Sequence, residues 1–206
     1  MLDQPSQARG SLMETLQFLR VVHVLTAIMM AWPAYALVAV NQRALLGPPL
    51  GDRADQFLDQ TVKSRVVPCY VFQATVLISG LALVLLRGLG WDVLISNPVL
   101  GVKFLLLLLV VVFLSIVTFG IQPRIDSLFA AHGGEPVGDP DAAAIRSLRT
   151  RRKRMASFCL FAVLTAAMLG AQVAVLFPLW LTVALVALIA AFTWRSYASP
   201  TPWGWA

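Results

Sequence analysis

The sequence predicts an all-α, polytopic membrane protein, and three observations support this fold class. Of its 206 residues, 59% are hydrophobic and only 13% are charged, and the mean hydropathy is +0.79. Soluble domains carry about 25% charged residues, so this composition favours a membrane as the solvent. Four apolar stretches, at 17–40, 66–86, 99–121 and 155–194, are long enough to cross a hydrocarbon core about 30 Å thick, which takes about 20 helical residues.

The first three stretches each fit one crossing, whereas the fourth is about twice too long. We expect it to break between Gly170 and Pro178, because proline removes a helical donor and clashes with the preceding turn. The prediction is a single integral-membrane domain, 1–206, whose five helices span about 17–40, 66–86, 99–121, 155–175 and 178–195. Four crossings followed by a tilted or interfacial tail remain the alternative.

The two long connections, 41–65 and 122–154, are predicted to be basic cytoplasmic loops that each contain a helix start. In the first loop, Asp52 can cap a helix that runs into the second crossing. In the second loop, Asp139 is the expected N-cap and Pro140 the first helical residue of a basic helix that enters the membrane.

The distribution of lysine and arginine predicts the orientation. One side carries Arg43, Arg53, Lys63, Arg65, Arg124, Arg146, Arg149, Arg151, Arg152, Lys153, Arg154 and Arg195. The other side carries Arg9, Arg20, Arg87 and Lys103. Twelve cations against four place both long loops in the cytoplasm of a bacterial-type inner membrane, with the N-terminus outside and the C-terminus inside.

The expected partners are the lipid bilayer and other membrane subunits. The basic run "RSLRTRRKR" lies beside a membrane helix, where such runs contact anionic lipid, so we expect no nucleic acid. The fourth helix places small residues at a spacing of four, which lets two helix backbones approach closely. These residues are Ala162, Ala166, Gly170 and Ala174. They can pack within this chain, which we favour, or against another subunit.

Few residues in the predicted crossings can carry chemistry. All ten Asp and Glu lie outside the crossings, which weighs against a proton pump or a cation-coupled transporter. The phosphate-loop and zinc-protease signatures are absent from the sequence. Cys69 and Cys159 lie near cytoplasmic helix ends and are expected to be reduced thiols, and His132 is expected to be solvated in a loop.

His23 is the exception, because it lies about six residues inside the first crossing. Lys103, near the outer end of the third crossing, is expected to share its leaflet. A neutral imidazole in lipid needs a partner. One possibility is a hydrogen bond to a backbone carbonyl or to Thr75 or Ser79, and the other is axial ligation of a haem iron or a chlorophyll magnesium. A bis-histidine haem within one chain is excluded, because the crossings contain no second histidine.

At these residues the chain resembles a superfamily of small helical membrane proteins that includes the HemJ-type protoporphyrinogen oxidases and the copper-resistance D membrane domain. The similar elements are "LRVVHVLTAIMMAW", "LGVKFLLLLLVVVF" and "RRKRMASF", and the resemblance spans about residues 17–175. It implies a role for His23 and Lys103 in binding haem b. The stretch "MMAWPAYALVAVNQR" and the extra fifth helix depart from the family pattern, so the resemblance implies the scaffold more than the oxidase activity.

Two functions follow from these features. The scarcity of polar groups favours a non-catalytic accessory subunit of a larger respiratory or photosynthetic membrane complex. Such a subunit can hold a tetrapyrrole, haem b or a chlorophyll-type pigment, with His23 as axial metal ligand. The alternative is a haem b-binding oxidoreductase that resembles the HemJ-type oxidases, with Lys103 as second ligand or acid/base.

Overall fold

Every element in the described part of the chain is a helix. The computed structural model describes residues 4–40, 50, 53–132, 137, 139–175 and 177–199. Five helical stretches are long and apolar enough to cross a membrane, and they are Gly10–Val40, Asp55–Leu86, Pro98–Ala130, Pro140–Val173 and Leu179–Ala198. The predicted fold class, an all-α bundle with five such helices, is confirmed.

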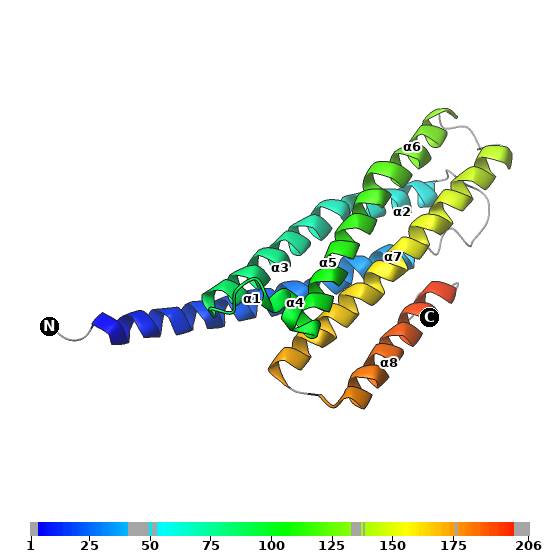
Figure 1. The fold of residues 1–206 in the computed structure, drawn as a ribbon. Coiled ribbons are helices and arrows are strands. Elements are labelled where there is room, and N and C mark those ends of the chain that lie inside the picture. Colours follow the sequence, from blue (N-terminus) through cyan, green and yellow to red (C-terminus); the bar gives the residue numbers. More distant parts are fainter. Residues whose placement is uncertain are drawn as a thin grey trace.

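Four helices form the centre of the bundle. Helix α1 (Gln4–Val40) packs against α3 (Val66–Leu86) and α7 (Asp139–Ala174), and α5 (Pro98–Ile116) packs chiefly against α7. Helix α8 (Leu179–Ala198) follows the outer flank of α7, and the first turns of α1 extend beyond the other helices (Figure 1). The fifth crossing is therefore an addition to a four-helix core.

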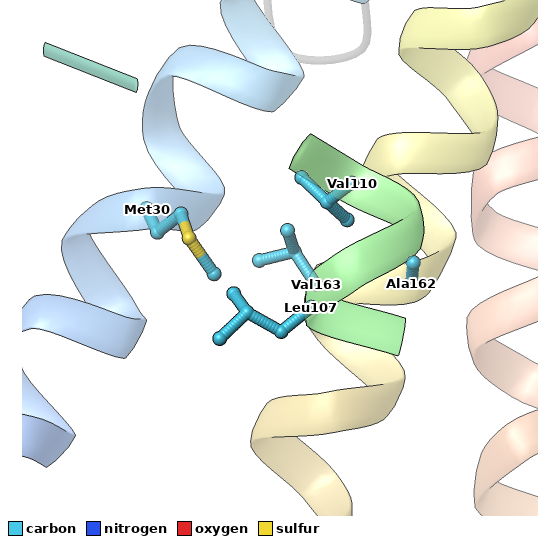
Figure 2. Packing of buried hydrophobic residues seen from close by; sticks show 5 residues of the cluster. All are labelled: Met30, Leu107, Val110, Ala162 and Val163. Atoms are coloured by element: carbon cyan, nitrogen blue, oxygen red, sulfur yellow. The ribbon is translucent and has the colours of Figure 1, made fainter. Parts of the chain in front are cut away.

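The largest buried cluster lies where α1, α5 and α7 meet. Met30 comes from α1, Leu107 and Val110 from α5, and Ala162 and Val163 from α7 (Figure 2). Helices in lipid associate through close van der Waals packing, because the lipid tails are as apolar as the side chains. The small side chain of Ala162 permits that close approach at the centre of the bundle.

The loop predicted over 122–154 is mostly helical. After α5, a π-helix, η2 (Val117–Ile121), leads directly into α6 (Gln122–Ala130). Pro123 lies in the first turn of α6, where its missing N–H and its ring would disturb a regular α-helix. The wider π turn accommodates it, so the helix continues where the sequence indicated a break.

The sequence analysis predicted a helix start in each of the two long connections, and the structure contains both helices. Helix α7 begins at Asp139, one residue before Pro140, which the sequence analysis predicted to be its first helical residue after an Asp139 cap. Helix α2 (Arg53–Ser64) leads into α3, as expected for the first connection, but the predicted cap Asp52 lies outside the described residues.

The connection between α3 and α5 sets the start of α5 and therefore the height of Lys103. Gly88 and Gly90 have positive φ angles, and the one-turn helix α4 (Val93–Ser96) follows them. The Asn97 side chain then accepts hydrogen bonds from the backbone N–H groups of Val99, at 3.0 Å, and Leu100, at 3.3 Å. This N-cap, with Pro98 after it, fixes the first turn of α5.

Candidate functional site

His23 is held by a short chain of hydrogen bonds that leads from α1 into α3. Its Nδ1 lies 2.9 Å from Ser79 Oγ, and Ser79 Oγ donates to the Thr75 carbonyl oxygen at 2.6 Å. A serine hydroxyl has one hydrogen, and a carbonyl can only accept. With the Ser79 hydrogen on the Thr75 carbonyl, Nδ1 donates to Ser79, and in that tautomer the neutral imidazole carries its proton on Nδ1 and a lone pair on Nε2.

Lys103 of α5 lies close enough to His23 for their charges to interact. Two glycines provide the space around these side chains. A Cβ atom on Gly80 would lie 3.1 Å from His23 Cε1, and one on Gly170 would lie 3.1 Å from Lys103 Nζ. The four central helices thus bring together an imidazole base, a primary ammonium and two positions without side chains.

The structure places the predicted site residues as follows. His23 and Lys103 come together near the same end of the bundle, and His23 has the Ser79 partner that the sequence analysis considered. Of the small-residue row on α7, Ala162 is buried in the cluster that α1, α5 and α7 share, and Gly170 lies against Lys103. Ala166 is half-buried, and the side chain of Ala174 lies outside the described part.

His132 differs from its expected environment. Instead of being solvated in a loop, it follows the last turn of α6 and is half-buried. Its Nδ1 lies 2.9 Å from the Leu128 carbonyl oxygen, and its Nε2 lies 3.4 Å from Asp141 Oδ2. Through these two contacts, His132 links α6 to α7.

A second polar cluster, at the other end of the bundle, joins α2, α6 and α7. Arg149 makes a bidentate pair with Asp55, at 2.6 and 2.9 Å, and both side chains are at most 3% exposed. Arg152 Nη1 donates to Asp59 at 2.9 Å and to Gln122 Oε1 at 2.5 Å. We call these five side chains the ion network.

The margin of the ion network is more exposed. Gln122 Nε2 donates to Asp59 Oδ2 at 3.1 Å and to Asp126 Oδ1 at 3.0 Å. Lys63 bridges Asp59, at 3.2 Å, and Asp126, at 2.8 Å. The sequence analysis missed this cluster because it treated these residues as loop cations and anions. The i,i+4 spacing of Asp55 and Asp59, matched by Arg149 and Arg152 one turn apart, was the available signal.

The two polar clusters indicate where the membrane lies. Gly170, beside Lys103, and Arg152, in the ion network, are 18 residues apart on α7, which is about 27 Å at 1.5 Å per residue. The hydrocarbon core of a bilayer is about 30 Å thick. The two clusters are therefore separated along α7 by about the thickness of a hydrocarbon core.

A cavity of about 40 Å³ lies between the helices. Its lining includes Cys69 of α3 and Cys159 of α7, both free thiols, together with Met30 and Gln73. The Gln73 side chain is 4% exposed, and its Oε1 makes no hydrogen bond with the described residues. The cavity has room for one or a few water-sized groups and not for a tetrapyrrole.

The arrangement at His23 offers one Lewis base and one cation. Among the described residues, no group of three or more His, Cys, Asp or Glu side chains is arranged to hold a metal ion. A bare metal ion would find a single nitrogen ligand at His23, whereas a metal that carries its own macrocycle needs only one axial ligand. Comparison of the chain with protein-family models, curated proteins and solved structures finds no match.

Proposed function

We propose that this five-helix membrane protein is an accessory subunit of a larger membrane complex and holds a tetrapyrrole through His23. The observation that carries the proposal is the hydrogen-bond chain from His23 through Ser79 to the Thr75 carbonyl. It leaves the Nε2 lone pair available, and metal-ligating histidines typically donate their other ring N–H in this way. Ser79 then orients the ligand, and His23 Nε2 binds the metal.

The surrounding residues fit a haem or a chlorophyll-type pigment. Lys103 is a cation near the boundary of the hydrocarbon core, where it would pair with a propionate of a haem. Because Gly80 and Gly170 have no side chains, His23 and Lys103 can pack closely against α3 and α7. Such a group supplies one-electron transfer or light absorption when bound, and the protein contributes its ligand, its orientation and its apolar surroundings.

The subunit assignment is supported by what the rest of the bundle provides. Apart from the His23 region and the ion network, the described crossings contain few groups that can act as acid, base or nucleophile. The ion network is internally paired and joins α2, α6 and α7, which is a structural task. The chain therefore has a ligand for a redox or pigment cofactor but few groups that could act on a substrate.

The proximity of Lys103 to His23 favours a second candidate, a haem b-binding oxidoreductase like the HemJ-type oxidases that the chain resembles. In that function His23 is the axial ligand. Lys103 pairs with a carboxylate of the substrate or exchanges a proton with the substrate, because a half-buried ammonium can serve as an acid.

Absorption spectra of the mildly solubilised protein, oxidised and reduced, test the proposal. We expect a near-stoichiometric tetrapyrrole band that His23→Ala abolishes and that Ser79→Ala weakens by about 10- to 100-fold in pigment affinity. His132→Ala, which changes the other histidine, should leave the band unchanged. A wild-type protein without the band, or a His23→Ala variant that retains it, would contradict tetrapyrrole binding.

The same preparation separates the two candidates. A subunit is expected to leave the membrane with stoichiometric partners, whereas an oxidoreductase should be extracted alone and oxidise a porphyrinogen with electron transfer to an added acceptor. Lys103→Met should abolish that oxidation while retaining the absorption band if Lys103 acts on the substrate.

A further inference from the structure

The basic residues at 149–154, which precede the membrane part of α7, point in different directions because successive helical residues lie on different faces. Arg149 and Arg152, one turn apart, face the acidic side chains of α2 in the ion network. Arg151 and Arg154 are exposed. Lys153 is directed towards α8, where its Nζ lies 4.8 Å from the centre of the Tyr197 ring.

The environment of Lys153 differs from that of the paired arginines. The residue is only 2% exposed, and neither it nor Arg154 forms an ion pair with a carboxylate in the described ranges. A buried cation is normally paired or hydrogen-bonded, because its hydration is lost. The face of an aromatic ring attracts an ammonium but supplies no negative charge.

Tyr197 also contacts the second cation. Arg154 Nε donates to the Tyr197 hydroxyl oxygen at 3.4 Å. A guanidinium can only donate, so Tyr197 accepts this bond and keeps its own hydroxyl hydrogen for another acceptor. Lys153 and Arg154 of α7 therefore both lie against Tyr197 of α8, and the described residues provide no anion there.

This place lies at the depth of lipid headgroups. Helix α8 has 20 residues, about 30 Å, which matches the hydrocarbon core, and Tyr197 is its penultimate residue. Lys153 directly follows Arg152, which marks the same boundary through the ion network. Tyrosine is enriched at this boundary because its ring is apolar and its hydroxyl is polar.

We propose that Lys153, Arg154 and Tyr197 form a binding site for a phosphate group, and that the phosphate belongs to the headgroup of an anionic phospholipid. The Lys153 ammonium supplies the positive charge, and Arg154 and Tyr197 donate hydrogen bonds to the phosphate oxygens. The site is independent of the cofactor proposed at His23, which lies at the other end of the bundle.

Lipid titration of the full-length, detergent-purified protein, followed by native mass spectrometry, tests this assignment. Phosphatidylglycerol and phosphatidylcholine with identical acyl chains are compared. We expect phosphatidylglycerol to bind more tightly, and Lys153→Met and Arg154→Gln each to weaken its binding about fivefold. Arg151→Gln removes an exposed neighbouring charge and is the matched control, with an expected change below about twofold.

Two further arms make the result decisive. Tyr197→Phe keeps the ring over Lys153 and removes the hydroxyl, so it should weaken lipid binding even if Lys153→Met fails to fold. Inorganic phosphate is the probe for a soluble ligand. The assignment is overturned if both lipids bind equally, if Arg151→Gln acts like Arg154→Gln, or if inorganic phosphate displaces the lipid at comparable concentration.

Discussion

The hydrogen bond between His23 Nδ1 of α1 and Ser79 Oγ of α3, over 2.9 Å, governs which ring nitrogen carries the proton. The direction follows from the next bond, in which Ser79 gives its hydroxyl hydrogen to the Thr75 carbonyl. A packing contact between two helices thus also defines a ligand or base, because Nε2 is left with its lone pair.

The His23–Ser79 bond predicts a coupling between the two residues. Ser79→Ala leaves the Nδ1 hydrogen without its acceptor, and hydrogen bonds between membrane helices contribute about 0.6 to 1.7 kcal/mol. A double-mutant cycle of Ser79→Ala and His23→Ala, measured by unfolding in mixed micelles, should give a coupling energy in that range. Strictly additive effects would show that the bond contributes nothing to stability.

Three of the helical glycines, Gly80, Gly170 and Gly10, have different surroundings, which predict an order of tolerance to alanine. Gly80→Ala places a methyl group against the imidazole, which Ser79 holds in place, so it should destabilise the fold. Gly170→Ala meets the flexible end of Lys103 and should be milder. Gly10→Ala meets nothing within 4 Å and should gain up to about 1 kcal/mol of helix propensity. Thermal unfolding in detergent checks the order, and equal effects at Gly80 and Gly10 would contradict it.

The Asp55–Arg149 pair predicts a large penalty for removing one partner. Asp55→Asn leaves a buried guanidinium without its counter-charge, which typically costs about 3 to 5 kcal/mol. The double variant Asp55→Leu/Arg149→Met removes both charges and should recover most of that loss. Asp126→Asn, at the exposed margin, should cost about 1 kcal/mol or less. Comparable losses at Asp55 and Asp126 would refute the distinction.

Gln73 predicts a stabilising substitution. Its Oε1 is buried beside the cavity and makes no hydrogen bond with the described residues, and an unsatisfied buried acceptor costs about 1 to 3 kcal/mol. Gln73→Met keeps the shape and removes the acceptor, so the unfolding midpoint should rise. Gln122→Met, which breaks the bonds of Gln122 to Asp59 and Arg152, is the matched control and should lower it. An unchanged midpoint for Gln73→Met would indicate that a buried water already satisfies the carbonyl.

Much of this architecture could be predicted from hydropathy and spacing. Twenty apolar residues in a row specify a crossing, and Pro178 specifies the break before α8, because both effects are local. The common depth of His23 and Lys103 followed from counting residues inward from the helix ends. Ser79 could be considered as the partner because few hydrogen-bonding side chains lie near that depth.

The rest depended on tertiary register. The break expected after residue 121 is absent because the π turn η2 accommodates Pro123 in a continuous helix. No local sequence pattern predicts a π turn. The ion network requires residues 93 and 94 positions apart to meet, and only the packing of α2 against α7 decides that. The positions of Gly80 and Gly170 opposite the two polar side chains likewise follow from helix rotation, which spacing alone leaves open.

The ion network has a consequence for how the chain enters the membrane. Topology is determined during insertion by lysine and arginine, with little influence from aspartate or glutamate, before the helices have packed. At that stage Arg149 and Arg152 are expected to act as positive charges that keep their end of α7 on one side of the membrane. Once α2 packs against α7, Asp55 and Asp59 neutralise the two arginines. The resulting ion pairs then hold α2 and α7 together. Neutralising the two aspartates should therefore destabilise the folded bundle without reversing its orientation, because the orientation is set before α2 packs against α7.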